Sequence, residues 1–239
     1  MGTTGSAIRK NGLIVAIDGP SGAGKSTITR RLADQLSYIY IDTGAMYRAL
    51  ALAVQRAGIS IDDQEKVVEL CRRAELSFRV EDGVSRIILN GEDVADQIRT
   101  PEISLLTSCI ASMKAVRELL LVKQRQMGQG GGVILEGRDI GTVVFPDADV
   151  KFFLSATAEE RGRRRYLELR GKGVQVDLAR TVDEVVARDL QDENRDHAPL
   201  RQAEDAIAVD STCLSIGEVV DGMVQIIEDR MRAAGIKEQ

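Results

Sequence analysis

The sequence predicts an α/β protein in which a parallel sheet of five strands is covered by helices on both faces. The first observation is a set of five short apolar runs without polar alternation, which is typical of strands buried on both faces. The second is that segments with helical character separate these runs, an order that favours a parallel sheet. The third is a glycine-rich loop between the first run and the helix after it. The runs cover residues 13–17, 37–41, 133–135, 149–154 and 206–210.

The glycine-rich loop directly follows the first predicted strand and carries a complete phosphate-binding pattern. Its three glycines let the backbone curl so that amide hydrogens point at a polyphosphate, and the next helix adds the positive end of its dipole. Lys25 can reach the β- and γ-phosphates, and the Ser26 hydroxyl can ligate Mg²⁺. We therefore expect a nucleoside triphosphate to bind at Gly19, Pro20, Ser21, Gly22, Ala23, Gly24, Lys25, Ser26 and Thr27.

Helices are predicted on both sides of the second strand. Apolar residues recur every four positions from 28 to 36, which gives the helix after the loop one apolar stripe. An Asp-Thr-Gly sequence ends the second strand, and a helix at 45–57 follows and stops at Gly58. Asp62 and Glu65 have the spacing of a capping box and start a helix that reaches about residue 74.

The pattern changes after this third helix. Residues 76–80 and 84–89 predict the two strands of a hairpin, joined by a turn at Glu81-Asp82-Gly83. A second turn is predicted at Asn90-Gly91. The hairpin therefore interrupts the strand and helix alternation of the main sheet.

The later helices are predicted from their first residues. A capping Ser or Thr followed by Pro, or by Glu three residues later, marks a helix start. A further helix at 116–127 ends in a run of glycines, and Gly171 and Gly173 end the helix that carries the 161–165 arginines. The predicted starts are Thr100-Pro101, Thr157 with Glu160, Thr181 with Glu184, and Ser215 with Glu218.

Composition excludes several classes of function. The net charge of −5 argues against a broad nucleic-acid surface, and no apolar run approaches the ~20 residues that cross a bilayer. The first ten residues lack the apolar core of a signal peptide. The three cysteines have no metal-ligand spacing, so we expect a cytoplasmic protein. His197 is the single histidine, which excludes a His metal cluster. The 24 arginines against 8 lysines fit either phosphate handling or codon usage.

In a parallel sheet covered by helices, ligands bind beyond the carboxyl ends of the strands. The groups expected there are the phosphate loop, Asp42-Thr43, residues 136–139 and Asp210. Three of these four groups carry charges or glycines suited to binding phosphate.

Four segments of the chain together resemble the bacterial cytidylate (CMP/dCMP) kinases, a branch of the nucleoside monophosphate kinases. The resemblance runs from residue 13 to about residue 235 and includes the hairpin. It implies transfer of the ATP γ-phosphoryl group to CMP or dCMP with Mg²⁺, by a monomer without nucleic-acid or membrane partners. The segments are IDGPSGAGKST at 17–27, YIDTGAMYRALA at 40–51, EGRDIGTVVFPDADVKFFL at 136–154 and RDLQDENRDHAPL at 188–200.

The resemblance also implies a division of the single kinase domain, residues 1–239. The core would comprise residues 13–44, 126–156 and 176–239. A monophosphate-binding region would span 45–125, enlarged by the hairpin, and a short lid would span 157–175.

The resemblance assigns the CMP phosphate to Arg48, Arg138 and Arg195, with Thr43 and Tyr47 beside them. A doubly charged acceptor must approach another polyanion, and clustered guanidinium groups make that possible. The acceptor is already an oxyanion and needs no general base. Catalysis is then positioning and charge neutralisation.

The resemblance places Arg161, Arg164 and Arg165 on the lid, over the transferring phosphoryl group. Together with Lys25 and Arg138 they form the expected catalytic set, because an arginine at that position can raise the rate by about 10³–10⁵. The alternative for the lid arginines is an ordinary solvated helix face.

The resemblance further assigns cytosine recognition to Ser108, Arg117 and Asp139, and ribose binding to Arg188 and Asp192. Each has a simpler alternative. Arg188 and Asp192 are four apart on one helix and could form an ion pair. Ser108 could be a helix-surface serine, and Asp139 could be a helix cap.

The Mg²⁺ site is expected at Ser26 and, through water, at Glu136, where this family often has Asp. Asp42 is the second candidate. Two rival functions fit the sequence less well. A GTPase switch would need Asn-Lys-x-Asp and Asp-x-x-Gly, and neither string occurs. A kinase of a small sugar or acid metabolite would have no use for the arginine cluster and the base-reading pair.

Overall fold

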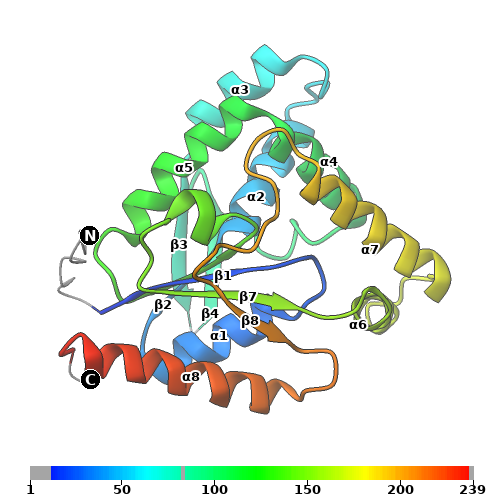
Figure 1. Ribbon diagram of the computed structural model, residues 1–239. Helices are drawn as coiled ribbons and strands as arrows, with labels where there is room; N and C mark the ends of the chain where they lie inside the picture. The colour runs from blue at the N-terminus through cyan, green and yellow to red at the C-terminus, as the bar shows by residue number, and fades with distance from the viewer. Residues whose placement is uncertain (1–11, 82–83, 237–239) are drawn as a thin grey trace. The chain divides into compact units, whose positions relative to one another are not determined.

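The structure is a computed structural model that describes residues 12–81 and 84–236 (Figure 1). The chain forms two compact units. One, here called the sheet unit, runs up to Tyr40 and resumes at Gly130. The other, the hairpin unit, is Ile41–Gln129. Asp82-Gly83, the centre of the predicted hairpin turn, lies outside the described residues.

The sheet unit contains the predicted five-stranded parallel sheet. Its central strand, β1, is buried along its whole length and pairs with β6 on one side and β7 on the other. The prediction that all five strands are buried is wrong for β8, where Ile207 is 40% exposed, because an edge strand is covered on one side only. The sheet order is β2-β6-β1-β7-β8. The strands are β1 (Ile14–Asp18), β2 (Ile39–Asp42), β6 (Val133–Gly137), β7 (Val150–Ser155) and β8 (Ile207–Asp210).

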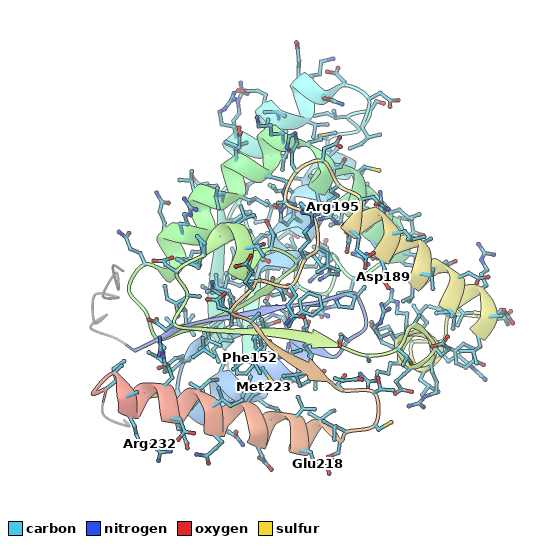
Figure 2. The ribbon with its side chains drawn as sticks, viewed as in Figure 1. Phe152, Asp189, Arg195, Glu218, Met223 and Arg232 are labelled. Atoms are coloured by element: carbon cyan, nitrogen blue, oxygen red, sulfur yellow. The ribbon has the colours of Figure 1, made fainter. Side chains whose placement is uncertain are left out.

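Two helices, α1 (Lys25–Leu36) and α8 (Ile216–Ala233), pack side by side against one face of this sheet (Figure 1). Phe152 of β7 and Met223 of α8 belong to the same buried cluster (Figure 2). Complete burial of such a side chain stabilises the fold by about 1.5–3 kcal/mol. The predicted capping box of α8, Ser215 with Glu218, is confirmed.

Three more helical segments belong to the sheet unit: η1 (Ile140–Val144), a short π-helical turn, α6 (Ala158–Gly171) and α7 (Leu178–Glu193). α6 begins at the predicted Thr157 cap and packs against α7. The predicted start of α7 is wrong. Asp177 caps this helix by accepting from the Arg180 amide, while the Thr181 hydroxyl donates back to the Asp177 carbonyl. The sequence did not predict η1.

The hairpin unit combines four helices with a three-stranded antiparallel sheet, in which the predicted hairpin is confirmed. α2 contacts α3, α4 and β4, and the apolar residues of these elements form one core. Met46, Leu50 and Ile110 are among its fully buried members. The elements are α2 (Thr43–Arg56), α3 (Gln64–Arg73), β3 (Leu76–Glu81), β4 (Val84–Leu89), β5 (Glu92–Asp93), α4 (Pro101–Ser112) and α5 (Lys114–Gly128).

Two helix starts in this unit differ from prediction. α2 begins two residues early because the Asp42 side chain accepts from the Ala45 amide at 2.8 Å. α3 is capped by Asp63 and not by Asp62. The predicted start of α4 at Thr100-Pro101 is confirmed. Across the described residues, every helix is too short or too polar to pass through a lipid bilayer.

Candidate active site

The phosphate loop joins the end of β1 to the start of α1. The backbone φ is +149° at Gly19 and +92° at Gly24, in the region that favours glycine. A Cβ at position 19 would lie 1.9 Å from the carbonyl oxygen of Leu154, so the loop can pass β7 only with glycine there. Gly24 is the N-cap of α1, and within the described chain no side chain caps this helix. Its first amides and its dipole are therefore suited to an anion.

The Lys25 side chain folds back over this loop. Its Nζ donates to the carbonyl oxygens of Gly19 at 2.9 Å and Pro20 at 2.7 Å, and the side chain is buried. Burial lowers the pKa of Lys25, and the neighbouring Arg138 guanidinium lowers it further, while nearby carboxylates oppose both effects. A phosphate placed in the loop favours the charged ammonium, so Lys25 is matched to a polyanion and not to an empty pocket.

Glu136, at the end of β6, is a buried carboxylate surrounded by hydroxyl groups. Its Oε1 accepts from Ser26 Oγ at 2.6 Å and from Tyr40 Oη at 2.9 Å. The neighbouring position of β1 and β6 brings these groups together, because α1 starts directly after the β1 loop. Hydroxyl and carboxylate oxygens are the hard ligands that Mg²⁺ prefers.

Asp42, the second candidate for the metal, is already engaged within the hairpin unit. Its Oδ1 accepts from the Ala45 amide and its Oδ2 from Arg48 Nη2, both at 2.8 Å. Asp42 therefore caps α2 and fixes Arg48, whereas Glu136 is hydrogen-bonded to the Ser26 hydroxyl beside the phosphate loop.

Arg138 and Arg195, both predicted to bind the CMP phosphate, meet at one carboxylate. Asp192, on α7, is 1% exposed and accepts from Arg138 Nε at 2.8 Å and from Arg195 Nη2. Burial alone would raise the pKa of Asp192, but the two guanidinium groups, with Arg188 beyond them, hold it below its usual range. Asp192 therefore lies between two residues that are predicted to bind phosphate.

Asp139 precedes η1, but its side chain makes no capping hydrogen bond to that turn within the described residues. The carboxylate of Asp18, the last residue of β1, accepts from the amides of Ile140 and Gly141 instead. The capping role left open for Asp139 thus belongs to Asp18. Burial raises the pKa of Asp18 to about 6, although the two amides lower it.

The three lid arginines have different surroundings on α6. Arg161 is buried, donates from Nη1 to the Ser21 carbonyl at 3.0 Å and pairs with Asp189 of α7 at 2.6 Å. It does not lie on a solvated face. Arg164 donates from Nη2 to the carbonyl of Ser211 at 2.7 Å. Arg165 pairs with Glu168 on the same helix, as a surface arginine does.

Of the remaining predicted residues, Arg188 lies on α7 in the sheet unit and the others lie in the hairpin unit. Arg117 is buried, and its guanidinium carbon lies 5.6 Å from the centre of the Tyr47 ring. Its Nη1 also donates to the Ala111 carbonyl at 3.1 Å. Thr43 opens α2, one residue after Asp42, and is buried. Ser108 donates to the Ser104 carbonyl at 3.4 Å, as an ordinary helical serine does.

The structure brings the predicted residues together in two groups of three and two pairs. The groups, both in the sheet unit, are Lys25, Ser26 and Glu136, and Arg138, Asp192 and Arg195. The pairs, both in the hairpin unit, are Asp42 with Arg48 and Tyr47 with Arg117.

Sequence reasoning missed three residues that hold predicted site residues, or the backbone beside them, in place. Asp18 is a charged residue at the end of a buried strand, a signal that could have identified it. Asp189, the partner of Arg161, and Ser211, the partner of Arg164, gave no such signal. Their positions become meaningful only once α6, α7 and β8 are placed around the loop.

The chain is similar in sequence to known cytidylate kinases. The family model described as cytidylate kinase matches residues 15–229. A cytidylate kinase from Geobacter sulfurreducens is 62% identical over 228 residues, which are 95% of this chain and 98% of that protein. One from Citrifermentans bemidjiense is 60% identical over 95% of this chain and 97% of its own length. One from Bacillus subtilis is 45% identical over 92% of this chain and 98% of its own length.

Proposed function

The chain belongs to the cytidylate kinase family, and from that premise we propose how its residues transfer a phosphoryl group from ATP to CMP. It is a nucleoside monophosphate kinase that acts on CMP or dCMP and gives the diphosphate. The observation that supports the residue roles is the pair formed by Ser26 and Glu136 beside the phosphate loop. In this proposal the enzyme works in the cytoplasm, as a monomer, on its two nucleotides alone.

On the donor side, the amides of the loop and of the first turn of α1 bind the ATP phosphates. Lys25 leaves the carbonyls of Gly19 and Pro20 to contact the β- and γ-phosphates, and its charge remains on the transferring group throughout. Both carbonyls belong to the phosphate loop itself, so the ammonium has a short distance to travel.

Ser26 and Glu136 would hold Mg²⁺, Ser26 directly and Glu136 through water. The described residues contain no group of three His, Cys, Asp or Glu side chains that could hold a metal by themselves, so phosphates and water would supply the other ligands. The ion neutralises charge on the phosphates when it is bound. Within the protein, Glu136 orients the Ser26 hydroxyl through the 2.6 Å hydrogen bond.

On the acceptor side, Arg138 and Arg195 would bind the CMP phosphate. Arg48, Thr43 and Tyr47 would bind it as well. Asp192 holds the first two guanidinium groups in place before the nucleotide arrives, as Asp42 holds Arg48. This arrangement costs little reorganisation when the dianion binds, since the arginines are already ordered.

The proposed lid, residues 157–175, contains α6. Arg161 anchors this helix to the loop through the Ser21 carbonyl and to α7 through Asp189. Arg164 and Arg165, whose side chains are about one third exposed at 29% and 31%, would turn toward the transferring phosphoryl group. Closure would exclude water from that group and so prevent hydrolysis.

Four of the predicted residues, with Asp192, would read the base and bind the sugar. Asp139 accepts from the cytosine 4-amino group, Arg117 donates to the ring nitrogen, and Ser108 contributes a hydroxyl. Arg188 and Asp192 bind the ribose. Uracil reverses both main contacts, because a carbonyl would face the carboxylate and an N–H would face the arginine.

The substrate range tests the function directly. In an assay of ADP release with CMP, dCMP, UMP, AMP and GMP, we expect CMP and dCMP to be used far better than the others. Sites built from buried polar groups discriminate by up to about 10⁴–10⁵ in favourable cases. Equal use of UMP and CMP would contradict the assignment of Arg117 and Asp139.

Asp139→Asn should narrow the gap between CMP and UMP. An amide can rotate to donate to the uracil carbonyl, so kcat/KM for CMP falls while that for UMP changes little or rises. The measurement is kcat/KM for both nucleotides in both proteins. A loss of thermal stability with an unchanged ratio would instead assign Asp139 a purely structural role.

A further inference from the structure

Asp18 is a buried carboxylate to which the mechanism gives no role. It is 4% exposed and ends β1, directly before the phosphate loop. Its Oδ1 accepts from the Ile140 amide at 2.8 Å and its Oδ2 from the Gly141 amide at 2.7 Å. These are the first amides of η1, which a helical turn leaves without internal partners. A residue more than a hundred positions away in sequence therefore fixes the start of this turn.

The backbone of Asp18 constrains the same segment from the other side. In the register of β1 and β6, Asp18 lies opposite Gly137. Only Arg138 and Asp139 separate Gly137, held by this pairing, from Ile140, held by the carboxylate. One residue of β1 thus fixes both ends of the two-residue segment that carries a proposed phosphate ligand and a proposed base reader.

We infer that Asp18 is a positioning residue for the acceptor nucleotide, which orients Arg138 and Asp139 together by clamping the chain on both sides of them. The inference rests on the proposed roles of these two residues. Stability alone is a poor reason for a charge at this place, because a buried carboxylate costs free energy that an apolar side chain would not. The two strong hydrogen bonds instead supply directional restraint.

Asp18→Asn tests the clamp with almost no change in shape. The amide keeps one acceptor oxygen, but its NH₂ group faces a backbone N–H, so one of the two restraints is lost. We expect KM for CMP to rise about tenfold and the CMP/UMP ratio of kcat/KM to fall, since loss of one hydrogen bond to a charged group has about this effect. KM for ATP should change less than KM for CMP, because both hydrogen bonds of Asp18 go to the amides of η1 and its charge is one of several around Lys25.

Asp149→Asn is the matched control. Asp149 also accepts a backbone amide of β1, that of Ile14 at 2.8 Å, but at the opposite end of the strand. The Asp149→Asn variant should lower thermal stability about as much as Asp18→Asn does. It should leave KM for CMP, KM for ATP and the CMP/UMP ratio of kcat/KM unchanged. If Asp18→Asn behaves like Asp149→Asn, or alters KM for ATP as much as KM for CMP, Asp18 is a structural cap and the inference is wrong.

The wild type and the Arg138→Ala variant show whether the proposed function, the role of Arg138 or only the clamp has failed. A wild type without activity on CMP overturns the function and the inference together. An active wild type with an unchanged KM for CMP in Arg138→Ala overturns the role of Arg138 and the inference, but not the function. If both behave as proposed and Asp18→Asn has no effect, only the clamp is wrong.

Asp18→Glu keeps the inference testable should Asp18→Asn not fold. The longer side chain keeps the charge and both acceptor oxygens, but it moves them away from their present positions, so the amides of Ile140 and Gly141 must shift to keep their hydrogen bonds. We expect a rise of about threefold in KM for CMP with a lower CMP/UMP ratio of kcat/KM. A folded Asp18→Glu protein with unchanged values would overturn the inference.

Discussion

Lys25→Ala is expected to reduce turnover by about 10³-fold or more while the protein remains folded. The variant removes the charge that stabilises the transferring phosphoryl group, and loss of a single donor of this kind costs about 10²–10³ even in uncharged cases. The side chain is bonded to two loop carbonyls and not to the apolar core. Steady-state kinetics with ATP and CMP, together with circular dichroism, measure the two effects separately.

Lys151→Ala is the matched control for this variant. Lys151 is another buried lysine of the sheet unit, and its Nζ donates to the Pro146 carbonyl at 2.6 Å and to Asp205. The Lys151→Ala variant should lose thermal stability in the same range as Lys25→Ala and keep turnover within a few-fold of the wild type. Near-normal turnover in folded Lys25→Ala would remove the basis for the phosphate-loop mechanism.

Asp192→Asn is expected to lower kcat/KM for CMP by about 10²-fold and to destabilise the fold. Without the carboxylate, Arg138 and Arg195 repel each other and no longer point at one phosphate. Breaking a buried ion pair from one side costs about 3–5 kcal/mol, which corresponds to about 10 °C in Tm for a protein of this size. Thermal unfolding and acceptor kinetics measure the two losses.

The pH dependence gives this prediction a definite sign. The pKa of Asp192 lies below the ordinary 3.8, so its stabilisation is fully present above pH 3.8 and is lost only as the pH falls through the lower folded-state pKa. The stability gap between wild type and variant should therefore be constant near neutrality and close in acid. Asp229→Asn, which breaks the exposed pair with Arg232 on α8, should change Tm by little (Figure 2). Equal losses from the two variants would contradict the role given to Asp192.

Local chemistry determined the parts of the fold that the sequence predicted correctly. Helices start at Thr100 and Ser215 because these side chains accept from backbone amides three residues later. Pro101 adds a ring that fixes φ in the helical range, and Glu218 completes the capping box. Each of these signals is visible within a few residues of sequence. The start of α7 was misplaced because Asp177 and Thr181 compete for the same turn, and only the folded backbone decides between them. The π-helical turn η1 was missed because Asp18, far away in sequence, caps it.

The sequence predicted which residues form the candidate site, but it did not predict which of them contact each other. The sequence indicated that the loop, Glu136 and Arg138 follow buried strands. It did not give the strand order, and the pairing of Ser26 with Glu136 follows only from β6 lying beside β1. Likewise, Arg161 resembled any arginine of a charged helix until Asp189 and the Ser21 carbonyl were placed around it. The roles of these residues in binding nucleotide stay predictions.

The central claim is that these residues deliver the ATP γ-phosphoryl group directly to the acceptor nucleotide, CMP or dCMP, and not to water or to the protein. Labelling the γ-phosphate of ATP and following it tests this most directly, because release of ADP alone does not distinguish transfer from hydrolysis. With CMP present, we predict that the label enters CDP, one CDP for each ADP formed, and that the protein carries none. Label that accumulates in inorganic phosphate at the same rate with and without CMP, or on the protein itself, would contradict the account.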